Sequence, residues 1–180
     1  MLKSAFGGGG FANKGRWTIH GLFSTLTLED DNQDYDVEWD QTFGELAVEY
    51  MLGNVGNHAF GVIAGVNYTK HEWKFTDQAT RERIKPDEDW TDAMIGVTHR
   101  VPFGGTWAWA NRIDYAGGDS EGVFNVTTGV NWNPYTHWVF NLGLGYRDVE
   151  YGEKGDVNDN DFYYYDTKET TINLGFLYIW

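Results

Sequence analysis

Apolar and polar residues alternate with a period of two along most of this chain. The alternation is clearest near the C-terminus, where Ile172, Leu174, Phe176, Tyr178 and Trp180 share one face of an extended segment. Successive side chains of a β-strand point to opposite faces, so the pattern predicts a strand with one apolar and one more polar face. Similar patterns predict eight strands in all, within the ranges 16–28, 46–50, 60–68, 93–97, 107–115, 124–132, 140–146 and 172–180.

The links between the predicted strands alternate between short and long. The short links are rich in Gly, Asn and Pro, which favour tight turns. Short turns at one end and long loops at the other are typical of up-and-down membrane barrels, in which an even strand count places both chain ends at the short-turn end. Short turns are expected within 53–57, 102–106 and 133–137, and outer links within 29–38, 74–89, 116–122 and 148–166.

Composition supports a barrel rather than a helical membrane protein. The net charge is -14 and the mean hydropathy is -0.51, and no run approaches the ~20 apolar residues that a membrane helix needs. A membrane barrel keeps a low average hydropathy, because only alternate strand residues face lipid. The first 15 residues contain four consecutive glycines and are expected to be a flexible segment preceding a barrel over 16–180.

Aromatic residues make up 17% of the chain, which is dense enough to form belts at both membrane surfaces. Aromatic rings with a polar edge prefer the membrane–water interface, and membrane barrels carry girdles of them. Phe60 and Tyr68 lie eight residues apart on one predicted face, or ~20 Å along the membrane normal, close to the thickness of the apolar band. The expected girdle residues are Trp17, Tyr50, Phe60, Tyr68, Trp107, Trp109, Tyr115, Phe124, Trp132, Tyr146, Phe176, Tyr178 and Trp180.

With these features the chain resembles the small eight-stranded outer-membrane barrels of the OmpA/OmpX type. The resemblance extends over nearly all of 16–180, and its most specific element is the aromatic C-terminal strand with Leu174, Phe176, Tyr178 and Trp180. In that family such a strand is the signal read by the barrel-assembly machinery, and its last residue is commonly Phe, where this chain has Trp180. The resemblance implies an all-β, eight-stranded antiparallel up-and-down transmembrane barrel in a bacterial outer membrane.

Charged residues of both signs fall on the predicted inward faces. A buried charge is strongly unfavourable unless it is paired, and eight-stranded barrels are usually filled by their side chains. We therefore expect a locked network of ion pairs in the lumen, with a narrow pore for small solutes as the alternative. The expected members are Glu45, Glu49, Arg100, Arg112, Asp114 and Arg147.

Two acidic outer loops raise the question of metal binding. Asp156, Asn158 and Asn160 stand at alternate positions, as at the start of a calcium loop, but the glycine and glutamate of that motif are missing. They remain a weak metal candidate, and no cofactor is expected. Carboxylates of both loops could also bridge lipopolysaccharide phosphates through divalent cations.

Catalysis and nucleic-acid binding are not expected. His20 and Ser24 share a face but stand ~13 Å apart along a strand, too far for a catalytic pair. The acidic balance lacks the basic patches of nucleic-acid binders. We expect a structural or surface-interaction role through the outer loops, with outer-membrane lipids, lipopolysaccharide and a protein or surface ligand as partners. Two alternatives are a lipid A-modifying enzyme and a soluble lipocalin-like barrel. The second is favoured by Gly15-Arg16-Trp17 at the start of the first predicted strand, which resembles the Gly-x-Trp of lipocalins.

Overall fold

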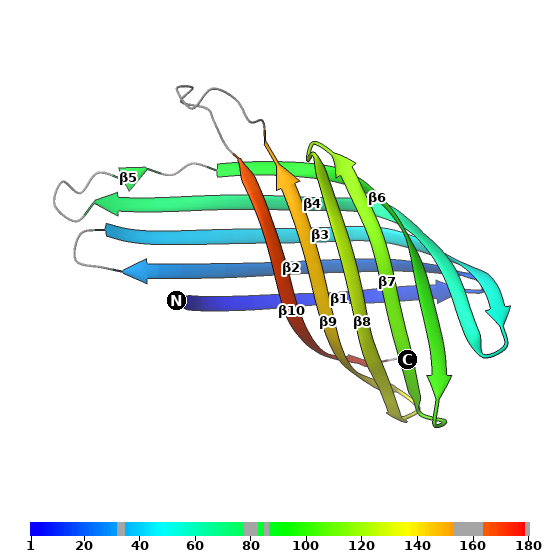
Figure 1. Ribbon diagram of the computed structural model, residues 1–180. Coiled ribbons are helices and arrows are strands. Elements are labelled where there is room, and N and C mark those ends of the chain that lie inside the picture. Colours follow the sequence, from blue (N-terminus) through cyan, green and yellow to red (C-terminus); the bar gives the residue numbers. More distant parts are fainter. Residues whose placement is uncertain (32–34, 78–82, 85–86, 153–163, 179–180) are drawn as a thin grey trace.

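The computed structural model describes residues 1–31, 35–77, 83–84, 87–152 and 164–178. Every regular element in these ranges is a β-strand, and Figure 1 shows them as one continuous sheet. The strands are β1 (Leu2–Lys14), β2 (Trp17–Asp31), β3 (Tyr35–Val55), β4 (His58–Asp77), β5 (Arg83–Ile84), β6 (Asp87–Phe103), β7 (Trp107–Gly118), β8 (Gly122–Tyr135), β9 (Trp138–Tyr151) and β10 (Tyr165–Tyr178).

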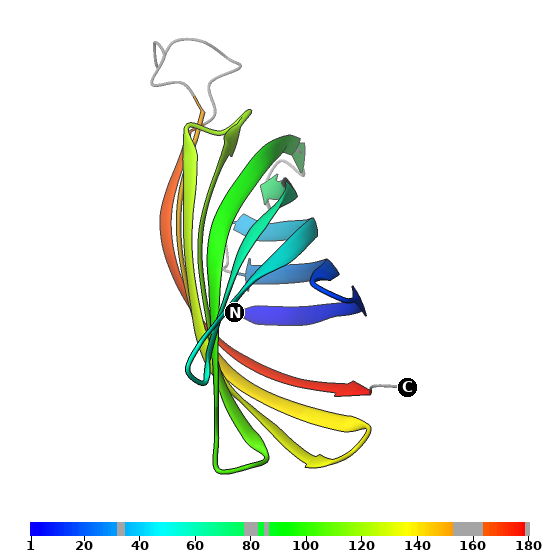
Figure 2. The same ribbon diagram turned by 90° about the vertical axis from the view of Figure 1, so that its right-hand side faces the viewer.

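The sheet is an antiparallel meander that curls into half of a barrel. Its order is β1-β2-β3-β4-β6-β7-β8-β9-β10, with the short β5 paired to β4 outside this path. Figures 1 and 2 show that β1 to β4 cross the direction of β7 to β10, as expected for a strongly twisted sheet. Among the described residues, β1 and β10 each pair with only one neighbour. The up-and-down, all-β prediction is confirmed, whereas the described sheet has nine strands along its path instead of eight.

The additional strand is β1, formed by residues expected to be a flexible segment. Its backbone pairs with β2 from Leu2 opposite Leu28 to Lys14 opposite Trp17. Because this strand makes the count odd, Leu2 lies at the long-loop end and Tyr178 at the short-turn end. The expectation that both chain ends share the short-turn end was therefore wrong.

The short turns lie within the predicted links. β3 and β4 are joined through Gly56 and Asn57, and β6 and β7 through 104–106. Gly56, Gly104 and Gly105 adopt positive φ angles of 63°, 60° and 76°, which residues with a Cβ adopt only at an energetic cost. The glycines in these links thus set where the chain reverses.

The strands at the opposite end are longer than the sequence pattern indicated. Trp73 and Phe75 belong to β4, which continues to Asp77, although the outer link was expected to begin at Lys74. Strand β3 begins at Tyr35 and contains 21 residues, about twice what a ~25 Å apolar band requires. Much of the expected outer loops is therefore sheet that continues beyond the apolar part of the strands.

Alternate side chains separate the two faces as predicted. On β4, Val62, Ala64 and Val66 are exposed, whereas Ile63 and Asn67 are buried. The buried face is the concave one, because its side chains contact strands that are not neighbours in the sheet. In the part of the chain that the structure describes, no helix is long and apolar enough to cross a membrane.

Candidate functional site

A charge cluster on the concave face joins strands β3 and β7. Arg112 donates two parallel hydrogen bonds to the Glu45 carboxylate, at 2.8 and 2.7 Å. Its Nε also donates to Asp114, at 2.7 Å, and Asn125 donates to the other Asp114 oxygen, at 2.9 Å. Paired, fork-like contacts are the strong geometry for arginine and carboxylate. Three of the predicted lumen residues are thus brought together.

Glu49 belongs to a separate group nearer the short turns. Its carboxylate accepts a hydrogen bond from Thr98 and contacts the His20 Nε2, at 2.9 Å. On the opposite, convex face the ring nitrogens of His58 and His99 contact each other, at 2.9 Å, and His99 also contacts Asn111 and stacks on Phe60. These three histidines therefore pair with groups other than a serine hydroxyl. The arrangement holds charge in place and supplies no Ser–His pair for acyl transfer.

The two remaining predicted lumen residues do not join either group. Arg147 extends from β9 across the concave face to β4, where it donates a hydrogen bond to Thr69 at 3.3 Å, and its guanidinium lies 4.8 Å from the centre of the Phe43 ring. Arg100 is exposed. Within the described ranges, neither arginine has a carboxylate at ion-pair distance.

Aromatic side chains fill the concave face above the charge cluster, toward the long-loop end. His71 is fully buried, and its ring meets Trp39, Trp90 and Tyr165 edge-on, with centroids 5.2, 4.9 and 4.6 Å apart. Trp90 in turn stacks on Tyr151, at 4.2 Å. These five residues, which we call the aromatic lid, come from β3, β4, β6, β9 and β10 and close this level of the half-barrel.

The sequence pattern did not identify the aromatic lid. Asn67, Thr69 and His71 continue one face at intervals of two, and extending that alternation beyond Tyr68 would have placed His71 inside. Trp90 stands between the expected outer link 74–89 and the predicted strand at 93–97, so it was assigned to neither. The lid was missed because the strands were taken to end at the membrane surface.

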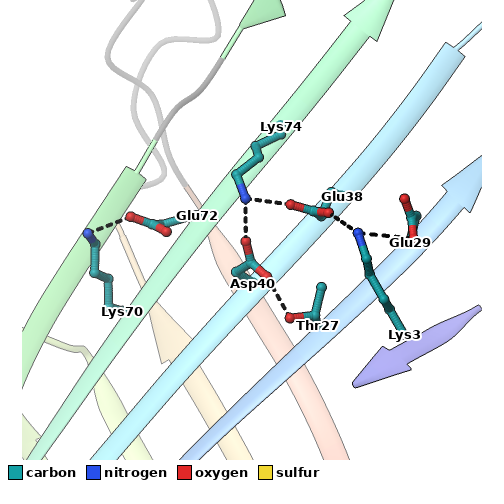
Figure 3. Close-up of polar contacts among 8 residues, drawn as sticks. All are labelled: Lys3, Thr27, Glu29, Glu38, Asp40, Lys70, Glu72 and Lys74. Carbon is teal, nitrogen blue, oxygen red and sulfur yellow. Dashed lines mark hydrogen bonds and ion pairs between the residues drawn. The ribbon is translucent and has the colours of Figure 1, made fainter. Parts of the chain in front are cut away.

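The convex face of the same strand ends carries rows of opposite charge (Figure 3). Lys74 forms ion pairs with Glu38 and with Asp40, the latter at 2.7 Å. Lys3 of β1 reaches the other Glu38 oxygen, at 2.6 Å, and Glu29, at 3.2 Å. These residues form a ladder in which each carboxylate lies beside a lysine.

The ladder shifts the proton affinities of its members. Hydrogen bonds from Lys3, which has the larger effect, and from Lys74 lower the pKa of Glu38 from 4.5 to about 2. The same contacts raise the pKa of Lys3, chiefly through Glu38, and that of Lys74, chiefly through Asp40. All three groups are therefore charged at neutral pH.

The predicted girdle residues lie on the convex face. Trp17, Trp109 and Tyr115 are about half exposed, and Tyr50 is partly covered because its ring packs 4.6 Å from Trp17. Trp180 lies outside the described residues. The others on this face are exposed as well: Phe60, Tyr68, Trp107, Phe124, Trp132, Tyr146, Phe176 and Tyr178.

Two sequence candidates are only partly covered by the structure. Leu174, Phe176 and Tyr178 of the expected assembly signal are exposed on β10. Asp156, Asn158 and Asn160 lie outside the described residues. Among the residues that are described, no three His, Asp or Glu side chains are arranged to hold a metal ion.

The concave face thus holds paired charges beneath an aromatic lid, and the convex face presents a broad apolar surface bounded by an ionic ladder.

No protein-family model matches the chain, and no curated protein sequence matches it.

Proposed function

We propose that this chain is an integral protein of a bacterial outer membrane, with a non-catalytic structural or surface-interaction role. Its strands form a closed transmembrane barrel of the OmpA/OmpX type, and its outer end is the interacting surface. The observation that supports this most directly is the change from apolar to ionic side chains at one level of the convex face.

That change occurs in register across three strands. Phe23, Gly44 and Tyr68 lie side by side on β2, β3 and β4. They form the last convex row on these strands that contains only aromatic residues and glycine. The next convex row contains Thr42 beside Lys70, and the rows beyond it carry the ionic ladder. A sharp boundary that crosses neighbouring strands together is the pattern a bilayer surface imposes.

The convex surface below this boundary is too apolar for contact with water. Val62, Val66, Ile95, Ile113 and Leu142 all expose more than a third of their surface. Exposed apolar areas of this extent are found where a protein meets lipid or another protein. A belt that continues over β2 to β10 fits lipid, which surrounds a barrel on all sides.

The concave face supports a sealed lumen. The Arg112–Glu45 pair crosses the half-barrel, and the aromatic lid covers the level above it. Eight-stranded barrels are just wide enough for side chains to fill them. A role at the outer surface therefore fits this interior better than solute passage does.

The proposed partners follow from position. Outer-membrane lipids would contact the apolar belt, and lipopolysaccharide head groups would lie at the level of the ionic ladder. Leu174, Phe176 and Tyr178 on the free edge strand β10 would be read by the barrel-assembly machinery. The strand ends above the ladder would meet a protein or surface ligand.

The test is refolding of the chain from denaturant into lipid vesicles, followed by gel electrophoresis with and without boiling. A membrane barrel resists detergent until it is heated, so the unboiled protein should migrate differently. Ala64→Arg, on the convex face midway between Phe60 and Tyr68, should strongly reduce insertion because a charge there faces the middle of the hydrocarbon. Thr42→Arg, on the same face above the boundary, is the matched control and should insert normally.

Planar-bilayer recordings of the inserted protein separate the two roles. The proposal expects an electrically silent membrane. Discrete conductance steps would replace the surface role by the pore. Equal insertion of Ala64→Arg and Thr42→Arg would show that the convex face does not meet lipid and would overturn the proposal.

A further inference from the structure

We propose that the barrel closes by pairing of β10 with β2, at the edge that β1 occupies in the open sheet. This inference rests on the proposed function, because an open sheet edge is tolerated in water but not in hydrocarbon. Unpaired backbone N–H and C=O groups inside a bilayer are strongly unfavourable, so membrane sheets close on themselves. The question is then which strand meets β10.

Strand directions favour β2. Neighbouring strands along the path are antiparallel, so β1 and β10, the first and ninth, run in the same direction. Their direct pairing would create a parallel seam, which is less stable than an antiparallel one. Strand β2 runs opposite to β10, and the eight strands from β2 to β10 on the path close with antiparallel pairs throughout.

The side chains of β1 also make it a poor wall of a membrane barrel. At the level of the belt its convex positions are Gly8, Gly10 and Ala12, which pair with Phe23, Gly21 and Ile19 of β2. All thirteen residues of β1 are exposed. Every other strand of the path carries several large apolar side chains on its convex face, such as Ile95 on β6 and Leu142 on β9, so β1 would leave a gap in the lipid-facing belt.

The sheet itself indicates the register of the new pair. In a barrel of eight strands that lie about 4.8 Å apart and are tilted by about 40°, consider a path around the wall at right angles to the strands. This path returns to the first strand about ten residues away from where it began. Thr170 therefore pairs near Thr27, and Leu174 near Phe23. The direct cross-strand path that leads to this register joins Trp17, Tyr50, Val62, Val97, Ile113, Val126, Tyr146 and Thr170.

In this register the convex side chains complete the belt. Leu174 stands opposite Phe23, and by antiparallel pairing Phe176 stands opposite Gly21. Leu174 and Phe176 are 81% and 75% exposed in the open sheet, more than the convex residues of the inner strands. Leu174 and Phe176 would thus take the places of Gly8 and Gly10 of β1, and Leu174 would gain Phe23 as a neighbour.

The contacts that β1 gives up are weak. Beyond its backbone pairing, its ion pairs are those of Lys3, whose side chain is 46% exposed. Exposed ion pairs contribute little, and Glu38 keeps its contact with Lys74. A displaced β1 leaves the membrane at the short-turn end, where water satisfies its backbone groups.

Cysteine cross-linking tests this closure directly, because the chain has no cysteine of its own. Leu174→Cys is combined in turn with Phe23→Cys and with Gly8→Cys in the full chain, inserted into vesicles and oxidised. Leu174→Cys with Thr25→Cys, and with Gly21→Cys, covers a register displaced by two residues. A further pair, Gly8→Cys with Phe23→Cys, reports whether β1 remains on β2; a Cβ at Gly8 meets no atom within 4 Å.

The inference expects most of the inserted protein to cross-link between β10 and β2, and little between Gly8→Cys and Phe23→Cys. Cross-linking of Leu174→Cys to Gly8→Cys would show a nine-stranded parallel seam and overturn it. Inserted protein with no β10 cross-link at any pair would mean that a strand from elsewhere fills the gap, which also overturns it. Loss of insertion itself, seen by gel mobility in the variants and in the unaltered chain, contradicts the proposed function instead.

Discussion

Arg112 on β7 and Glu45 on β3 form a two-bond ion pair although β4 and β6 lie between their strands in the sheet. The pair therefore crosses the concave face and holds its two sides together. Glu45 is only 6% exposed, so removing its charge leaves Arg112 short of its main partner in a poorly solvated place.

We expect Glu45→Gln to destabilise the protein by about 1–3 kcal/mol, because Arg112 loses its two-bond partner but keeps Asp114. Denaturant unfolding in vesicles, followed by tryptophan fluorescence, measures this. Glu72→Gln removes a more exposed partner of Lys70, 44% exposed, and should cost less than about 1 kcal/mol. Similar losses in both variants would refute the bridging role of Glu45.

Gly96 on β6 lies against the backbone of β7. A Cβ built there would meet the Ile113 carbonyl oxygen at 2.4 Å and the Asp114 Cβ at 2.5 Å. Gly96→Ala should therefore force the strands apart and lower the free energy of unfolding by about 1–3 kcal/mol, as at other overpacked sites, so that the unfolding midpoint falls. Gly10→Ala, where a Cβ meets nothing within 4 Å, is the matched control and should leave the midpoint almost unchanged.

Acid should weaken the ionic ladder at Glu38. In the open sheet Lys3 and Lys74 stabilise the carboxylate and lower its pKa from 4.5 to about 2, and Lys74 still lowers it when β1 is displaced. A depressed folded-state pKa contributes stability that is complete above 4.5 and disappears as the pH falls toward 2. Glu38→Gln should thus be less stable than the wild type at pH 7 and equal to it near pH 2, in denaturant titrations at both pH values. A difference that persists at pH 2 would assign the effect to packing.

Trp90 is the centre of the aromatic lid and is 1% exposed. Trp90→Ala should lower stability by about 3–5 kcal/mol, as truncation of a buried aromatic does, and should remove most of the near-UV circular dichroism from the stack with Tyr151. Trp109→Ala on the convex face, with 47% exposure, is the control. Conductance that appears only in Trp90→Ala would identify the lid as the seal of the lumen.

The sequence predicted the parts of the fold that depend on alternation. The convex residues of β4, β7 and β9 and the short turns lie where the pattern indicated, because a half-buried strand must alternate. The pattern failed at the ends of the strands. Polar residues such as Lys70 and Glu72 were left outside the predicted strand 60–68, whereas they form convex rows of sheet outside the belt.

The contact partners of side chains across the sheet were harder to predict than the face on which each side chain lies. Arg112, Glu45 and Asp114, which were expected in one network, contact one another on the concave face, but Glu49 contacts His20, and Arg147 packs on Phe43. These choices depend on the height of each residue in the curled sheet, which the period of two does not contain. Strand β1 was missed because consecutive glycines carry no alternation at all.

The central claim, that the convex face of this sheet meets lipid, is tested most directly by spin labels along β9 in vesicles. Single cysteines are introduced from Val139 to Arg147, labelled, and measured for collision with dissolved oxygen and with a water-soluble nickel complex. The account predicts that Phe140, Leu142 and Leu144 collide with oxygen, which concentrates in hydrocarbon, while Asn141, Gly143 and Gly145 do not. Collision with nickel along the whole strand, without alternation, would contradict it.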